Sequence, residues 1–404
     1  ARNWGRLDMK CNWKECTLGD LITFQRGHDL PKSQMINGKY PVVGSNGIIG
    51  YHNEYTTEAP SITIGRSGNV GNPYIVYGRT WSHNTTLYVK DFKGNDPVFV
   101  YYFLKTIDLA NYAGGSAVPT LNRNHIHTLP IEVPESVGVQ KKIGYYLRLF
   151  DEKIELNNEI NKNLEQQAKI LFKSWFVDFE PFDEPLIETP AGIYAPASLQ
   201  MVQIANIPHV LETGKRPKGG AVASGVPSIG AENVKQLGIV NFSSAKFIPE
   251  EFAAKMKTGA INGYELLLYK DGGKPGTFIP HFSMFGEGFP YQKFFINEHV
   301  FKLDFGDKGF NEFAYFFLQT DYAYHWLASN GGKAAVPGIN QQNVKDIWIF
   351  SPENSKVKEF GEWVQPLFTT ILKNCTQNVK LAELRDTLLP KLMSGELDVS
   401  DIEI

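Results

Sequence analysis

Two stretches of the sequence place apolar residues alternately four and three positions apart, which predicts two long amphipathic helices. In the first stretch these positions are Ile143, Leu147, Phe150, Ile154, Asn157, Asn161, Leu164, Ala168, Leu171 and Trp175. Adding 217 to each number gives the second set: Phe360, Val364, Leu367, Ile371, Asn374, Asn378, Leu381, Arg385, Leu388 and Leu392. Heptad spacing of this length is typical of a coiled coil, and an amphipathic helix lying on a domain surface is the alternative.

We call these twenty positions the seam of the helix pair. The asparagines among them favour one way of pairing the two helices. A polar residue in an apolar seam costs stability but fixes which positions face each other. An antiparallel pairing would set Asn157 opposite Asn378 and Asn161 opposite Asn374, with Arg385 against Phe150 in a cation–π contact. A parallel pairing would leave Arg385 facing an alanine. We therefore expect an antiparallel pair.

The rest of the sequence also repeats, and repeats decide architecture. Residues 116–122 (Ser-Ala-Val-Pro-Thr-Leu-Asn) match residues 334–340 (Ala-Ala-Val-Pro-Gly-Ile-Asn) at an offset of 218, and a Gly-Gly pair precedes each. Each leads into a strand-like run that ends at a proline. The chain thus contains two large, similar but unequal parts.

Short apolar runs between Gly, Asn and Pro clusters predict strands in both parts. They cover residues 41–43, 62–64, 74–77 and 86–89, and then residues 266–269, 294–296 and 300–303. Helices are expected at 97–109 and 313–327, with residues 315–318 matching residues 101–104. Four prolines between 180 and 197 rule out a continuous helix there and predict an ordered or semi-rigid linker.

These patterns together predict an α+β fold. Two pseudo-repeated α/β domains are separated by two long antiparallel coiled-coil helices. The predicted segments are residues 1–135, 136–180, 181–353 (including the linker) and 354–404.

Composition narrows the class of protein only slightly. The 404 residues are 42% apolar and 21% charged, with a net charge of −3. This charge argues mildly against a nucleic-acid binder, although acidic helices can offset basic lobes. Cys11, Cys16 and Cys375 fit neither a disulfide framework nor a zinc site, so a reducing cytoplasm is expected. No run of 18 apolar residues predicts a membrane span. No signal peptide is expected before the first domain, and residues 1–10 look like an irregular leader.

No catalytic or metal-binding constellation emerges from the motifs. Asn72-Pro73-Tyr74 lacks the second proline that an adenine-methylating motif needs. The glycine-rich residues 65–71 are not followed by a helical pattern, so they predict a hairpin turn and not a nucleotide loop. His125 and His127 alternate on a strand-like segment and are expected at the surface or in a groove.

Three motifs carry a family resemblance. Trp13-Lys14 is followed by Leu18-Gly19-Asp20-Leu21, Gln-Lys-Lys-Ile at 140–143 opens the first long helix, and Leu-Leu-Pro-Lys-Leu-Met-Ser-Gly-Glu at 388–396 closes the second. With the order domain, helix, domain, helix, the chain resembles the specificity subunit of type I restriction–modification systems over nearly its whole length.

The resemblance implies a non-catalytic, cytoplasmic subunit that reads an asymmetric bipartite site in double-stranded DNA. It implies two target-recognition domains and two bound modification subunits, which methylate adenine. It also allows added restriction subunits that cut DNA. S-adenosylmethionine, ATP and Mg²⁺ would then belong to the partners, and no cofactor is expected in this chain.

DNA affinity comes mainly from Lys and Arg at phosphates, and sequence is read by Arg, Lys, Asn and Gln at base edges. The candidates are Arg66, Ser67, Arg79, His83, Asn122, Arg123 and Asn124 in the first part, and Lys215, Arg216, Lys218, Lys270, Lys274, Lys333, Asn340, Gln341 and Gln342 in the second. Each can instead belong to a solvated turn, and Asn122 and Asn340 can cap the turn that follows them.

About forty residues of helix span roughly 60 Å, so the helix pair would act as a ruler between two half-sites. Its charged faces would dock the modification subunits. Two other classes of protein remain open. A two-lobed scaffold would lack salt-sensitive DNA binding. A self-sufficient enzyme would transfer methyl groups without partners.

Overall fold

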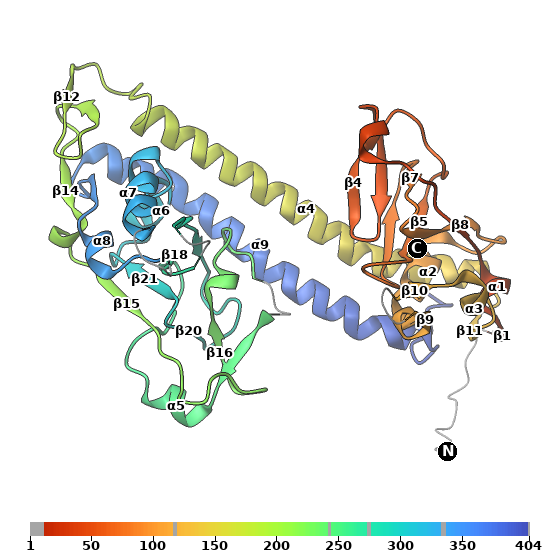
Figure 1. Cartoon of the computed structure of the whole chain (residues 1–404). Coiled ribbons are helices and arrows are strands. Elements are labelled where there is room, and N and C mark those ends of the chain that lie inside the picture. Colours follow the sequence, from red (N-terminus) through yellow and green to blue (C-terminus); the bar gives the residue numbers. More distant parts are fainter. Residues whose placement is uncertain (1–11, 116–118, 241–243, 273–275, 333–336, 403–404) are drawn as a thin grey trace. The chain divides into compact units, whose positions relative to one another are not determined.

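The computed structural model describes residues 12–115, 119–240, 244–272, 276–332 and 337–402. The chain forms two compact units (Figure 1): unit 1 comprises residues 1–153 with 380–404, and unit 2 comprises residues 154–379. Two long helices, α4 (Val137–Phe176) and α9 (Ser355–Met393), each contribute residues to both units. The helices are therefore shared between the two units, whereas the sequence divided the chain into four consecutive segments.

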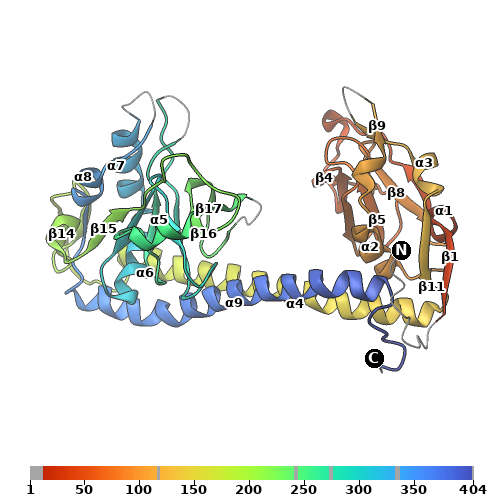
Figure 2. The ribbon, with the colours of Figure 1, turned by 90° about the horizontal axis from the view of Figure 1, so that it is seen from below.

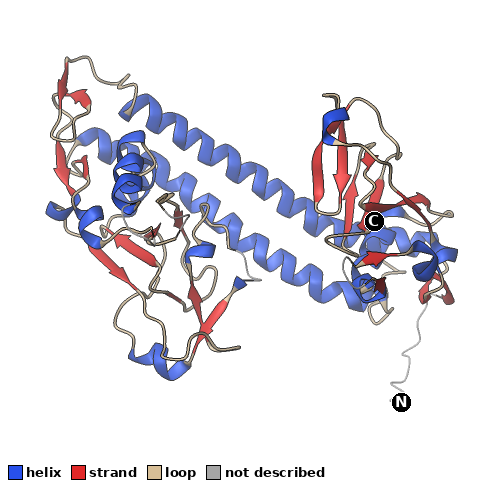
Figure 3. Cartoon of the chain, viewed as in Figure 1, coloured by secondary structure: helices blue, strands red, loops and turns tan. Residues whose placement is uncertain are grey.

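Unit 1 contains a four-stranded sheet of order β2-β8-β5-β6, a three-stranded sheet of order β4-β3-β7, and the pairs β1-β11 and β9-β10 (Figure 3). Its strands are β1 (Trp13–Thr17), β2 (Thr23–Arg26), β3 (Tyr40–Gly44), β4 (Gly47–His52), β5 (Ser61–Gly65), β6 (Pro73–Val76), β7 (Trp81–Ser82), β8 (Thr86–Asp91), β9 (Ala113–Gly114), β10 (Thr120–Leu121) and β11 (Pro130–Pro134). Its short helices are α1 (Leu18–Leu21), α2 (Pro97–Thr106), α3 (Arg123–His127) and the 3-10 turns η1 (Lys32–Gln34) and η2 (Leu109–Tyr112).

Unit 2 repeats this topology. Its four-stranded sheet has the order β15-β21-β18-β19, its three-stranded sheet the order β17-β16-β20, and β14 pairs with β22. Its strands are β12 (Leu186–Glu188), β13 (Tyr194–Pro196), β14 (Met201–Gln203), β15 (Val210–Thr213), β16 (Val226–Ile229), β17 (Lys246–Ile248), β18 (Leu266–Tyr269), β19 (Phe282–Met284), β20 (Phe295–Ile296), β21 (Val300–Asp304) and β22 (Trp348–Phe350). Its short helices are α5 (Glu250–Lys255), α6 (Lys308–Phe317), α7 (Asp321–Gly331), α8 (Gln341–Lys345) and the 3-10 turns η3 (Ile204–Asn206) and η4 (Ala231–Asn233).

The expected strands are found in both units, and the pairing repeats in detail. In each three-stranded sheet one pair is parallel, β3 with β7 and β16 with β20, while the other pair is antiparallel. The proline-rich linker is ordered and contains the hairpin of β12 and β13, whose Ala195 is buried in unit 2. The chain is thus a mixed helix-and-sheet protein built from one topology used twice.

The helix expected at 313–327 is wrong in its bounds. The structure has two helices there, because the Thr320 side chain accepts a hydrogen bond from the backbone N–H of Ala323 and begins α7. The proposed match of residues 315–318 with 101–104 is also displaced. The equivalent N-cap residues are Asp96 of α2 and Asp307 of α6, which lie 211 positions apart. Tyr101 therefore corresponds to Glu312.

Each unit builds its core from its sheets and from both long helices. Leu389, Leu392 and Met393 at the end of α9 pack into the core of unit 1. In unit 2, α4 contributes Phe172 and Phe176, whose rings pack against Phe313 and Phe360. Buried aromatic side chains of this size dominate the energetics of a core.

The two long helices lie side by side and antiparallel (Figures 1 and 2). The seam positions named from the sequence are all buried or half-buried. The buried ones are Ile143, Leu147, Asn157, Ala168, Phe360, Val364, Ile371 and Leu392, and the half-buried ones are Phe150, Ile154, Asn161, Leu164, Leu171, Trp175, Leu367, Asn374, Asn378, Leu381, Arg385 and Leu388. Asn157 donates to Asn378 Oδ1 at 2.8 Å, and Asn374 donates to Asn161 Oδ1 at 2.8 Å. These are the asparagine pairs of the antiparallel register, while supercoiling stays a prediction.

The expected stacking of Arg385 on Phe150 is wrong. Arg385 forms ion pairs with Asp151, which neighbours Phe150 in sequence, and with Asp386. The hydroxyl of Tyr102, on α2, donates a hydrogen bond to the carboxylate of the same Asp151. A charge-assisted bond is stronger than a cation–π contact, so the carboxylate takes the arginine. Among the described residues, no helix is long and apolar enough to span a membrane.

One buried carboxyl group in unit 2 has no partner. Glu312 of α6 is fully buried, and neither of its side-chain oxygens has a hydrogen-bond partner among the described residues. Burial raises the pKa of Glu312 to about 8, nearby Lys308 lowers it in part, and Asp307 raises it. When the pKa of an acid is higher in the folded chain than in the unfolded chain, the folded state becomes less stable as the pH rises from the lower pKa to the higher one.

Glu312→Gln should therefore stabilise unit 2 increasingly between pH 4.5 and pH 8, because glutamine cannot ionise. We expect little gain at pH 4.5 and a gain of roughly 2–4 kcal/mol at pH 8. The measurement is the melting temperature of variant and wild type across this pH range. Glu362→Gln, on an exposed residue of α9, serves as the control. A gain that does not change with pH would contradict the prediction.

Candidate nucleic-acid interface

Four loops of unit 1 are joined by backbone hydrogen bonds. Arg66 N–H, just after β5, donates to Thr85 O between β7 and β8 at 2.8 Å. Leu121 N–H donates to Arg66 O at 2.9 Å, and His28 N–H donates to Ser82 O at 2.8 Å. We call residues 27–29, 65–67, 83–85 and 120–124 loop cluster 1. Because main-chain groups close it, its backbone does not depend on particular side chains.

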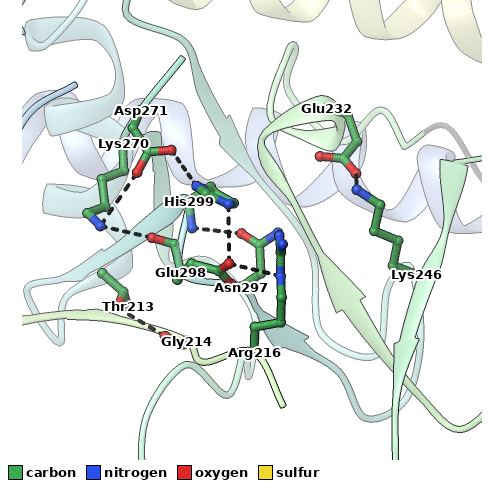
Figure 4. Close-up of polar contacts among 10 residues, drawn as sticks. All are labelled: Thr213, Gly214, Arg216, Glu232, Lys246, Lys270, Asp271, Asn297, Glu298 and His299. Atoms are coloured by element: carbon green, nitrogen blue, oxygen red, sulfur yellow. Dashed lines mark hydrogen bonds and ion pairs between the residues drawn. The ribbon is translucent and has the colours of Figure 1, made fainter. Parts of the chain in front are cut away.

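Unit 2 joins the equivalent loops in the same way. Lys270 N–H donates to His299 O at 3.0 Å, and Ile339 N–H donates to Lys270 O at 2.8 Å. Gly214 N–H, after β15, donates to Asn297 O at 3.2 Å. We call residues 214–216, 269–271, 297–299 and 338–343 loop cluster 2; Figure 4 shows part of it.

The strand registers and these bonds give a residue-by-residue correspondence between the clusters. Arg26 pairs with Leu87 on β2 and β8, as Thr213 pairs with Phe301 on β15 and β21. Ser67 bridges Thr120 as Asp271 bridges Gly338. The corresponding pairs are Asp29 with Arg216, Arg66 with Lys270, Ser67 with Asp271, Asn84 with Glu298, and Thr85 with His299. The backbone is retained while nearly every side chain changes.

A glycine at the end of β2 and of β15 makes the close approach possible. A Cβ on Gly27 would lie 2.1 Å from His83 O, and a Cβ on Gly214 would lie 1.5 Å from Ile296 O. Neither position has room for a side chain, so both clusters need glycine there.

Loop cluster 2 carries a network of charges (Figure 4). Arg216 Nε lies 2.9 Å from Glu298 Oε1, and the same oxygen lies 3.2 Å from His299 Nε2. His299 Nδ1 also contacts Asp271. Lys270 Nζ donates to the backbone O of Glu298 at 3.0 Å and lies 3.6 Å from the Asp271 carboxylate. Two cations and two carboxylates thus balance around one histidine.

Loop cluster 1 holds a different set of side chains on the same frame. Asn84 Nδ2 donates to Asp29 Oδ1, and Arg26 lies 3.7 Å from the same carboxylate oxygen. His83 Nδ1 lies 3.1 Å from Thr85 Oγ1. The place of Arg216 is taken by an acid, so the two clusters offer different donors and acceptors to a ligand.

The structure brings together Arg66, Ser67 and His83 with residues 122–124 in loop cluster 1, and Arg216 and Lys270 with residues 340–342 in loop cluster 2. Lys215 and Lys218 are exposed beside Arg216. Arg79 lies elsewhere: it forms a 2.7 Å ion pair with Glu58 and lies over the Tyr55 ring at 4.6 Å. Hydrogen bonding to Glu58 raises the pKa of Arg79.

Several candidates also have structural roles. Asn122 accepts from Asn124 N–H and caps α3, and Asn340 forms a capping box with Asn343 at α8. Gln341 donates to Leu211 O at 3.1 Å, and Gln342 donates to Asp346 at 2.6 Å. Arg123 is exposed at the start of α3. Lys274 and Lys333 lie outside the described residues.

The strand expected around His125 and His127 is wrong, because both residues belong to helix α3. His127 Nε2 accepts a hydrogen bond from Phe24 N–H at 3.0 Å, and burial lowers the pKa of His127. It is therefore a neutral structural residue. The hairpin turn expected at 65–71 is present between β5 and β6. Among the described residues, no group of three or more His, Cys, Asp or Glu side chains could hold a metal ion.

The sequence did not single out Asp29, Asp271, Glu298 or His299. A search of the sequence for basic and amide side chains passes over carboxylates. The signal that could have found them is the correspondence of residues 83–85 with 297–299, at an offset of 214.

Comparisons with known proteins agree with this repeated architecture. Residues 10–166 match the type I restriction modification DNA specificity domain. The type I restriction enzyme MjaIX specificity subunit of Methanocaldococcus jannaschii is 28% identical over 318 residues, 75% of this chain and 70% of that protein. The HindI specificity subunit of Haemophilus influenzae is 24% identical over 371 residues, 74% of this chain and 77% of that protein.

A solved structure has a similar fold. The crystal structure of a type I restriction–modification S subunit from M. genitalium superimposes with a TM-score of 0.61 at 18% identity, covering 96% of this chain and 97% of that one. The resemblance carried by the sequence motifs is confirmed by these matches.

Gly27→Ala should loosen loop cluster 1, because its Cβ cannot fit against His83 O. Overpacking of this kind typically costs about 1–3 kcal/mol. We expect lower melting temperature of unit 1 and faster amide hydrogen exchange at residues 83–86. Gly78→Ala is the matched control in the same unit, since a Cβ there would meet nothing within 4 Å. Equal effects of the two substitutions would contradict the steric account.

Proposed function

We propose that this chain is a type I restriction–modification specificity subunit, which reads an asymmetric bipartite DNA site for adenine-methylating partners. One observation supports this proposal most directly. The two units keep one backbone frame in their loop clusters but carry different side chains on it. A constant backbone that carries different exposed groups in the two units suits recognition of two different DNA sequences, one by each unit.

Each loop cluster would contact one half-site. Exposed Lys215, Lys218 and Arg123 would contact phosphates, which supply affinity but no sequence information. Side chains such as Arg66, Lys270 and Arg216 would reach base edges in the major groove, where each base pair has its own pattern of donors and acceptors. Unequal clusters would make the recognised site asymmetric.

Catalysis would lie in the partners. Two modification subunits would dock on the charged faces of α4 and α9, and restriction subunits would join them in some complexes. S-adenosylmethionine, ATP and Mg²⁺ would bind to those subunits. This chain would determine the DNA sequence at which those subunits act.

DNA binding by the complex should depend strongly on both sequence and salt. Contact with about six phosphates predicts a slope near −5 in a plot of log affinity against log salt concentration. The measurement is binding of a duplex whose motif comes from methylome sequencing of cells with and without this chain. A methylome that does not change with the chain, or binding that ignores salt, would sink the proposal.

The recognised spacer should follow the length of the helix pair. The two helices have 40 and 39 residues, and a heptad adds about 10 Å to a helix. We expect insertion of one heptad into both helices to lengthen the spacer while leaving the two half-site sequences unchanged. Methylome sequencing reads both quantities at once. A spacer of unchanged length would refute the ruler, and a heptad added to α4 alone should abolish methylation by breaking the pairing.

A further inference from the structure

Arg216 is held in a defined orientation at the surface of unit 2. Its side chain is 45% exposed, and its Nε bonds to Glu298 at 2.9 Å. Because this ion pair uses Nε, both terminal Nη groups keep their N–H donors. Among the described residues, the ion pair of Arg216 is with Glu298. The guanidinium is therefore anchored through Nε (Figure 4), which leaves the edge formed by its two Nη groups for a further partner.

The partner of Arg216 is itself fixed from several sides. Glu298 Oε1 also faces His299 Nε2 at 3.2 Å, and Lys270 Nζ bonds to the backbone O of Glu298 at 3.0 Å. His299 N–H donates to Asn297 Oδ1 at 2.9 Å, which shapes the turn that carries all three residues. The carboxylate is thus a rigid support for the arginine.

Folding alone does not account for Glu298. Its second oxygen, Oε2, is buried and has no hydrogen-bond partner among the described residues. Burying an unpaired carboxylate oxygen destabilises a protein. A glutamate that costs stability at this place, and holds an arginine, fits a ligand-binding role better than a purely structural one.

The open edge of Arg216 has a natural ligand in DNA. Two parallel N–H donors match the O6 and N7 acceptors of guanine in the major groove. Holding the guanidinium in advance lowers the entropy cost of binding. Lysine could not replace it, because an ammonium group is a point donor without the planar fork.

The equivalent position in unit 1 carries different residues. Asp29 stands where unit 2 has Arg216, and Asn84 stands where it has Glu298. The hydrogen bond between the two loops is kept, with Asn84 donating to Asp29. The nearby arginine of unit 1, Arg26, comes instead from β2 and lies 3.7 Å from Asp29, so the two clusters hold their arginines at different positions.

We propose that Arg216, oriented by Glu298, reads a guanine in the half-site bound by unit 2. This inference rests on the proposed function and adds a residue and a base to it. It assigns Glu298 as a positioning residue that acts through Arg216.

The test is competitive binding by the full complex of this chain with its modification subunits. The wild-type motif comes from methylome sequencing, and a set of duplexes changes each base pair of it in turn. The variants are Arg216→Ala, Arg216→Lys and Glu298→Gln. Lys246→Ala is the matched control, because Lys246 also forms an exposed ion pair in unit 2, with Glu232 at 2.7 Å (Figure 4).

We expect Arg216→Ala to remove the preference for one guanine in one half-site, a loss of roughly five- to 150-fold, while binding to duplexes already changed at that base pair stays the same. Arg216→Lys keeps the charge and should lose most of this preference, and Glu298→Gln should lose part of it at the same base pair. Lys246→Ala should change no base preference.

Three results overturn the inference while leaving the proposed function intact. The first is a uniform weakening on all duplexes, which would make Arg216 a phosphate contact. The second is an unchanged guanine preference, and the third is a motif with no guanine in either half. If the wild-type complex shows no sequence preference at all, the proposed function itself fails.

Discussion

The structure depends most on the hydrogen bonds between asparagine side chains in the middle of the helix pair. Asn157 donates to Asn378 and Asn374 donates to Asn161 in one register, and a shifted helix would lose both hydrogen bonds and bury these amide donors against apolar side chains. The same register carries Leu392 into the core of unit 1 and Phe176 into the core of unit 2. Both cores, and the loops built on them, therefore depend on it.

The long-range repeat of the sequence predicted much of this fold, because heptad spacing and asparagine positions can be read from the sequence without knowing which residues are neighbours in space. The repeat did not predict which of several nearby side chains would pair with one another. Arg385 lies at a seam position facing Phe150, but the adjacent Asp151 offers a stronger partner. One hydroxyl at Thr320 likewise divides a run of apolar residues into two helices. Such outcomes depend on free-energy differences of about a kcal/mol between two possible partners, and the spacing of residues alone does not reveal these differences.

The sequence singled out basic and amide residues of the two loop clusters but not their acidic residues. Arg66, Lys270 and Arg216 follow from the chemistry of DNA contacts, whereas Glu298 has meaning only beside Arg216. The offset between equivalent residues also changes along the chain, from 214 at residues 83–85 to 211 at the caps of α2 and α6 and 218 at residues 120–122. Loop lengths set these steps, so no single offset between the repeats could pair the two clusters.

The loop clusters are closed by main-chain groups and by two glycines, and this has an evolutionary consequence. Because few side chains in the clusters contribute to the stability of the fold, most substitutions there are expected to change the free energy of unfolding very little. Single mutations can then change the side chains that a unit exposes without passing through unfolded intermediates. A lineage of such chains would therefore change the groups that its loop clusters expose faster than it changes the scaffold that holds them.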